Sequence, residues 1–197
     1  PSPDGKLVAV SISQGGSESG DVHIFDVKTG KDTGELVPRV NGGTAGGSLA
    51  WNKDGTGFFY SRYPRDTDRP AADMDFYTHV YFHKIGTPTK ADMHELGDGK
   101  EHPAVPGTTL GRRNAFEFTR IAEIMLASDE NSGKVLCTVQ HGDGGTFAFY
   151  LRDEKGDWKL IADYDDKVVQ AAFGPNGSLY LISVSYTHLT LPTNREV

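Results

Sequence analysis

The sequence has one cysteine, no long apolar run and no excess of basic residues. These features argue against an internal disulfide, a membrane span and nucleic-acid binding, respectively. The single cysteine, Cys137, cannot form an internal disulfide, and the alternating apolar run KVLCTVQ around it predicts a buried core thiol. No apolar stretch approaches the roughly 20 residues that span a bilayer, so no membrane partner is expected. The 27 acidic residues outnumber the 20 basic ones, and no basic run offsets the net charge of −7, so nucleic acid is not an expected partner either.

The beginning of the chain also lacks an initiator methionine and a visible signal peptide. Pro1 stands in the middle of a turn, so we expect the native N-terminus to be missing. The compartment, cytoplasm or periplasm, is therefore left open.

Glycine and proline are abundant, and they occur in short clusters. The 24 glycines and 10 prolines predict many tight turns, and hence many short strands. A hydrophobic fraction of 37% with 24% charged residues is typical of a globular chain rather than a disordered one.

Four of these turns introduce similar apolar runs. Asp/Asn-Gly turns supply the positive φ that a tight hairpin needs. The turns and the runs that follow them are SPDG with KLVAVSIS, NKDG with TGFFYSRY, DENSG with KVLCTVQH, and GPNG with SLYLIS. All but the first are also preceded by a strand-like run, so each unit is predicted to begin with a hairpin.

A second hairpin follows in the first three units, which makes a four-stranded antiparallel meander. The turn glycines Gly5, Gly55, Gly133 and Gly177 are 50, 78 and 44 residues apart, and the shorter intervals fit the period of about 40–50 residues of a β-propeller blade. The long interval contains KEHPAVPGTTLGRRN, which we interpret as a surface insertion.

The fold class predicted from this repeat is all-β: a partial β-propeller of about three complete blades plus the first hairpin of another. The expected blades cover residues 1–40, 41–98, 115–164 and 168–184. A β-sandwich is the rival arrangement, but it does not predict a common four-strand unit. TRIAEIMLA has apolar spacing that a helix could also show, and its place before SDENSG favours a strand.

Several stretches resemble the N-terminal propeller of the prolyl oligopeptidase family of serine peptidases. The most specific are AWNKDGTGFFYSRYP followed by YFHKIGT, and QHGDGGTFAFYLR. The resemblance covers most of residues 1–184. It implies a seven-bladed propeller attached to an α/β-hydrolase domain that carries the whole Ser-His-Asp triad, so this chain is expected to lack the catalytic domain and to be inactive alone.

The resemblance further implies that the parent protein cleaves short peptides after proline, with the propeller gating access and the hydrolase domain as its partner. By motif position it gives Phe59 a part in lining the apolar substrate pocket, although strand-core packing explains this residue equally well. Phe58 and Phe59 should face opposite neighbours, because adjacent strand residues point to opposite faces. A stand-alone WD-repeat-like interaction scaffold is the alternative function.

The end of the chain departs from the family pattern. After SLYLIS the sequence VSYTHLTLPTNREV shows neither a turn signal nor clear alternation, so we expect residues 185–197 to be a non-native tail.

The sequence contains no complete motif for a catalytic serine. A nucleophile elbow needs G-x-S-x-G, because its strained turn has no room for side chains beside the serine. Ser48 has Gly46 before it but Ala50 after it, and Ser19 stands where the second glycine of GGSES belongs. We interpret both stretches as glycine-rich loops, and no catalytic residue is assigned.

No metal or cofactor is expected either. His79 and His83 have the spacing of a helical zinc pair, but on a strand they would be about 13 Å apart. We interpret them as polar residues of a half-exposed strand. HGDGG at 141–145 and DYDD at 163–166 lack the ligand order of a calcium loop. The arginines in SRYPRDTDRPAADMD are mixed with carboxylates, which is typical of solvated surface.

Overall fold

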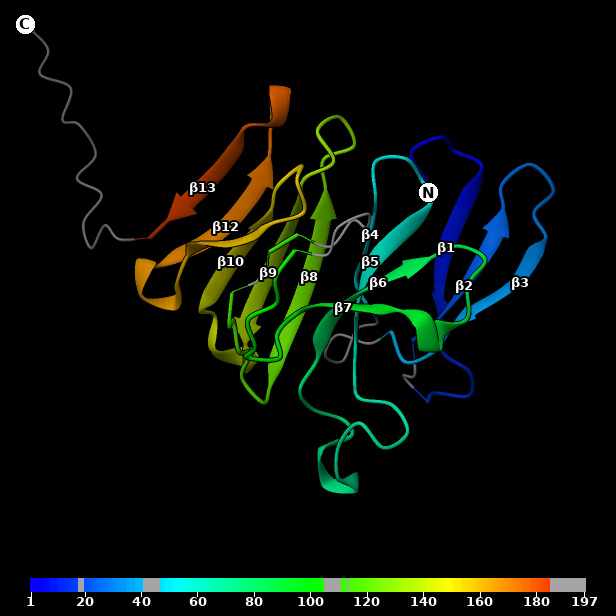
Figure 1. Cartoon of the computed structure of the whole chain (residues 1–197), viewed down its shortest axis with the longest axis horizontal. Coiled ribbons are helices and arrows are strands. Elements are labelled where there is room, and N and C mark those ends of the chain that lie inside the picture. The colour runs from blue at the N-terminus through cyan, green and yellow to red at the C-terminus, as the bar shows by residue number, and fades with distance from the viewer. Residues whose placement is uncertain (18–19, 41–46, 105–110, 113, 185–197) are drawn as a thin grey trace, which may run out of the picture.

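The structure is a computed structural model that describes residues 1–17, 20–40, 47–104, 111–112 and 114–184. Its antiparallel sheets stand side by side in chain order, fanned out from an N-terminal sheet to a C-terminal two-stranded hairpin (Figure 1). No helix within these ranges has both the length and the apolar character needed to cross a membrane.

The described residues form 13 strands in four sheets. Blade I contains β1 (Leu7–Ile12), β2 (Asp21–Asp26) and β3 (Asp32–Val37). Blade II contains β4 (Leu49–Trp51), β5 (Gly57–Arg62), β6 (His79–Lys84) and β7 (Met93–Leu96). Blade III contains β8 (Ala122–Ser128), β9 (Val135–His141), β10 (Phe147–Arg152) and β11 (Trp158–Ala162). The last hairpin contains β12 (Val168–Phe173) and β13 (Leu179–Ser183).

Short 3₁₀ turns connect some of these strands. They are η1 (Ala71–Asp73), η2 (Thr89–Ala91), η3 (Gly142–Gly144), η4 (Tyr164–Asp166) and η5 (Pro175–Gly177).

These sheets confirm the predicted fold class. Strands pair in sequence order as antiparallel meanders, with four strands in blades II and III. The four turn glycines of the repeat have φ between +68° and +77°, a conformation that glycine adopts at little cost. TRIAEIMLA contributes strand β8, as its place in the repeat predicts. Residues 105–110 of the predicted insertion and the predicted tail lie outside the described residues.

The hydrophobic core is divided among the spaces between neighbouring sheets. Along β5 the side chains alternate: Phe58 and Tyr60 belong to the cluster shared with blade I, and Phe59 belongs to the one shared with blade III. The same alternation on β9 places Cys137 toward blade II and Leu136 toward the last hairpin. Blades II and III therefore bury both of their faces, one against each neighbouring sheet.

Buried polar groups also cross both gaps between blades. Between blades I and II, His83 Nε2 lies 2.9 Å from Glu35 Oε1, and the His83 side chain is fully buried. Between blades II and III, Trp158 Nε1–H donates to Glu95 Oε2 at 2.8 Å. Burying such groups is tolerated only when they are hydrogen-bonded, so these contacts fix how adjacent blades align.

Candidate functional site

Phe59, the residue assigned to substrate by resemblance, lies in the core between blades II and III. It is 1% exposed, its ring centroid is 4.9 Å from that of Phe82, and it meets Trp158 edge-on at 6.5 Å. The Arg152 guanidinium lies 4.8 Å from the Phe59 ring centroid. Its role at a substrate pocket stays a prediction, and its contacts within the described chain are packing contacts.

We expect Phe59→Ala to lower the free energy of unfolding by about 3–5 kcal/mol, because it leaves a cavity between two blades. Urea denaturation followed by tryptophan fluorescence measures this. Tyr180→Ala is a matched control, since Tyr180 is 61% exposed and its loss should change stability by less than about 0.5 kcal/mol. Equal effects of the two substitutions would contradict the core position of Phe59.

Other charged and imidazole side chains of blade II and its connections line a polar pocket. The pocket has a volume of about 490 Å³ and lies where β5 ends, β6 begins and the chain leaves β7. The connection between β5 and β6 supplies much of its wall, including Asp68 and Arg69.

Aromatic rings and a carboxylate hold Arg62, the last residue of β5, and Arg69 of the connection that follows. Arg62 lies over the Tyr81 ring at 3.9 Å and pairs with Asp68 at 2.9 Å, and its side chain is only 11% exposed. Arg69 lies over Tyr77 at 3.6 Å. The prediction of a solvated arginine surface is therefore wrong for Arg62. The hydrophobic pattern could not show this, because the covering rings come from another strand.

Two histidines of adjacent strands meet at the pocket. His94 Nε2 on β7 is 3.3 Å from His79 Nδ1 on β6, and their rings meet edge-on. Burial, reinforced by the nearby charge of Arg69, lowers the pKa of His79 to about 4. His79 is therefore neutral near pH 7 and can accept a hydrogen bond.

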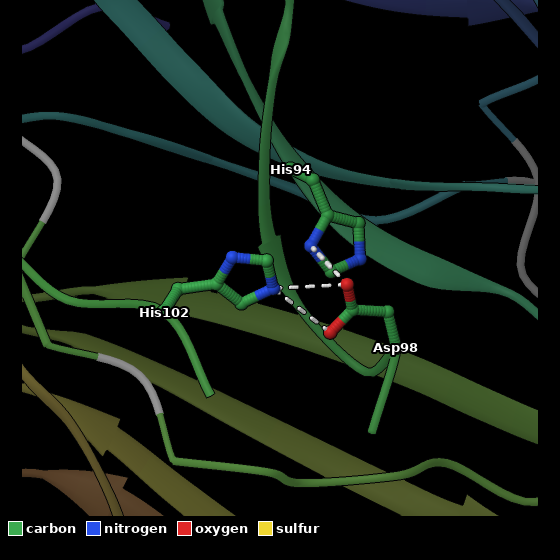
Figure 2. A group of neighbouring side chains, drawn as sticks. All are labelled: His94, Asp98 and His102. Carbon is green, nitrogen blue, oxygen red and sulfur yellow. Dashed lines mark hydrogen bonds and ion pairs between the residues drawn. The ribbon is translucent and has the colours of Figure 1, made fainter. Parts of the chain in front are cut away.

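The segment after β7 adds a carboxylate and another imidazole beside His94. Figure 2 shows His94, Asp98 and His102 turned toward one another. Asp98 Oδ2 is 2.9 Å from His102 Nε2 and 3.8 Å from His94 Nδ1. Burial works to raise the pKa of Asp98, but its hydrogen bond from His102 and the nearby His94 outweigh burial and lower it. The cluster therefore combines a carboxylate with two imidazoles, a ligand set known for transition metals.

The serine and histidine motifs singled out in the sequence are used structurally. The Leu126 N–H on β8 donates to Ser48 Oγ at 2.7 Å, which joins two blades. Ser19 lies outside the described residues. His79 and His83 lie on strand β6 as predicted, but the prediction of a half-exposed strand is wrong: both side chains are buried, with different partners.

The remaining motifs fold as predicted turns. HGDGG forms η3 and DYDD forms η4, which begins with a capping box between Asp163 and Asp166. Cys137 is fully buried and free, as predicted, and burial raises the pKa of its thiol so that it stays protonated.

Sequence reasoning missed the cluster of His94, Asp98 and His102. The available signal was their spacing of four residues each. It lies across the end of β7 and a segment without a named strand, where neither a helical nor a strand period applies. Only the tertiary path of the chain shows that the three side chains converge.

Fanned four-stranded meanders with interblade cores define this chain as a β-propeller unit. The family model for the prolyl oligopeptidase N-terminal β-propeller domain matches residues 1–123, more than half of the 197 residues. The chain belongs to the prolyl oligopeptidase family.

Curated relatives agree with this assignment. The chain is 30% identical to the prolyl oligopeptidase ophP of Omphalotus olearius over 93% of its own length, which is 29% of that protein. It is 37% identical to the prolyl endopeptidase of Elizabethkingia miricola over 49% of this chain and 13% of that protein. The chain therefore spans less than a third of the length of these relatives.

Solved structures show the same fold at lower identity. Prolyl oligopeptidase B of Galerina marginata matches 91% of this chain and 24% of its own, with a TM-score of 0.62 at 17% identity. Oligopeptidase B of Leishmania major matches 80% of this chain and 18% of its own, with a TM-score of 0.53 at 15% identity.

Proposed function

We propose that this chain is the substrate-gating propeller portion of a serine endopeptidase that cleaves short peptides after proline. The observation that carries the proposal is 30% identity, over 93% of the chain, to a protein named a prolyl oligopeptidase. Other relatives are named prolyl endopeptidases, in agreement with a peptidase parent.

Several polar side chains of the described residues make structural hydrogen bonds within and between blades, which supports a gating role rather than a catalytic one. Ser48 Oγ accepts a backbone hydrogen bond, and His83 and Glu95 tie blades together. Chemistry by acyl transfer is then the task of a Ser-His-Asp triad in an α/β-hydrolase partner domain. The propeller limits access to that triad, so short or unfolded peptides enter and bulk water is restricted.

We expect the purified 197-residue chain to show no cleavage of a short proline-containing chromogenic peptide. In this proposal the Ser-His-Asp triad belongs to the hydrolase partner domain, so release of chromophore should equal that of a buffer control. Turnover that persists through a second, different purification, and that a serine-directed inhibitor abolishes, would contradict the proposal that catalysis belongs to the hydrolase domain alone.

The gating role needs the complete reading frame. That frame is expected to encode a G-G-S-N-G-G-type elbow, and the intact enzyme to favour short peptides over a folded protein of equal proline content. A propeller-deleted version that folds should lose this preference.

Phe59→Leu in the intact enzyme should raise KM if Phe59 also contacts substrate. Further blades followed by a stop codon would favour the interaction scaffold instead.

A further inference from the structure

The polar pocket of blade II contains a group of side chains that the proposed gating role does not use. His94 belongs to the outer strand β7, and Asp98 and His102 follow on the segment that leaves it. Their ligand atoms all lie within 4.8 Å of one another (Figure 2). All three side chains are partly buried, between 21% and 29% exposed.

We propose that His94, Asp98 and His102 bind one divalent transition metal ion of the zinc class, which fastens the segment after β7 onto blade II. The proposal is independent of the peptidase role. It departs from the expectation, drawn from the sequence, that the chain holds no metal.

The distances are close to those that a metal requires. A tetrahedral zinc ion with bonds of about 2.0–2.1 Å holds its ligand atoms about 3.4 Å apart. Asp98 Oδ2 lies 2.9 Å from His102 Nε2 and 3.8 Å from His94 Nδ1, values on either side of that spacing. The remaining pair, His94 and His102, has its ligand atoms within 4.8 Å, so side-chain rotations that draw these two rings together and lengthen the Asp98–His102 contact would place an ion among the three, where it replaces the proton between Asp98 and His102.

The surroundings of His94 favour metal binding through Nδ1. In the tautomer that presents Nδ1 to the ion, Nε2–H donates to His79 Nδ1, 3.3 Å away. Such a second hydrogen bond is typical of metal-bound histidines, because it fixes the ring and makes the ligand more basic. The Tyr81 ring also meets the His94 ring edge-on at 5.1 Å, which restricts its rotation.

The ligand chemistry selects among metals. Two imidazoles with one carboxylate suit zinc, nickel or copper, whereas calcium and magnesium prefer six or more oxygen ligands. Three protein ligands leave a fourth position. Since His94 and Asp98 also line the pocket, water in the pocket can fill it.

The test is a zinc titration of the tag-free, chelator-treated 197-residue chain by calorimetry. We expect one zinc ion per chain, and binding at least ten-fold weaker in both Asp98→Asn and His102→Gln. His141→Gln is the matched control, because His141 is exposed on blade III and should leave the affinity unchanged. Zinc should also raise the melting temperature of the parent and the control, but not of His102→Gln.

Absence of binding, unchanged affinity in both variants, or an equal loss in His141→Gln would overturn the proposal, the last by showing that scattered surface histidines hold the ion. If the variants do not fold, cobalt bound to the parent decides. Intense visible bands of a four-coordinate ion support the site, and the weak bands of a six-coordinate hydrated ion overturn it.

Discussion

Glu95→Ala is expected to lower the free energy of unfolding by about 3–5 kcal/mol. Glu95 is fully buried, accepts a hydrogen bond from Trp158 at 2.8 Å and lies 3.6 Å from Arg152 Nε. Truncation removes the carboxylate that compensates a guanidinium whose side chain is only 7% exposed. A buried charge that loses its partner costs more than the pair contributes.

Urea denaturation measures this loss, with Glu130→Ala in the exposed turn before β9 as the control. The control should change stability by less than about 0.5 kcal/mol. The double replacement Glu95→Leu with Arg152→Met should be less harmful than Glu95→Ala, because it removes both charges together. A Glu95→Ala variant as stable as the control would show that the pair does not hold blades II and III together.

Raising the pH above neutrality is expected to weaken the contact between blades I and II. His83 is fully buried, with Nδ1 2.7 Å from Asp92 Oδ1 and Nε2 2.9 Å from Glu35 Oε1. Burial works to lower the pKa of His83, but its hydrogen bonds to these two carboxylates outweigh burial and raise it above 6.5. Only the protonated ring can donate to both carboxylates at once.

The raised pKa of His83 sets the direction in which its stabilisation changes with pH. The stabilisation is fully present below the unfolded-state value of 6.5 and is lost as the pH rises through the folded-state pKa. The contribution of His83 to the free energy of unfolding, taken as the difference between the parent and His83→Gln, should therefore fall between pH 6 and pH 9, by at most about 1.4 kcal/mol per pH unit for one proton.

The pH dependence is measured by urea denaturation across that range. His83→Gln should remove this fall and should itself cost about 3–5 kcal/mol at pH 6, since the buried carboxylate of Asp92 and the partly buried one of Glu35 lose their shared cation. His141→Gln, on an exposed ring, should keep the slope of the parent. Identical slopes in the parent and in His83→Gln would refute a charged His83 between the blades.

The turns and strands were predictable because they depend on neighbouring residues. Gly5, Gly55, Gly133 and Gly177 all have the positive φ that their hairpins require. The assignment of TRIAEIMLA to a strand also succeeded, because the repeat order outweighed a helix-like spacing. Local turn chemistry and repetition therefore suffice for the fold class.

The polar residues were less predictable, because their surroundings come from distant parts of the chain. His83 was predicted on a half-exposed strand and Arg62 on a solvated surface, yet a carboxylate 48 residues away contacts the first and a ring on the adjacent strand covers the second. The periodicity of the sequence does not predict which part of a blade face the neighbouring blade covers. The burial of a charged side chain is therefore determined only when the blades pack together.

The sequence by itself determined the unit of this protein: a hairpin-built meander, apolar on both faces, repeated at intervals marked by Asp/Asn-Gly turns. The tertiary structure alone decided which polar side chains became buried links between blades, and that His94, Asp98 and His102 converge. The physical reason is the distance along the chain between the residues that interact. Backbone conformation and side-chain alternation are set by adjacent residues, whereas hydrogen bonds between blades depend on how whole sheets are placed against each other.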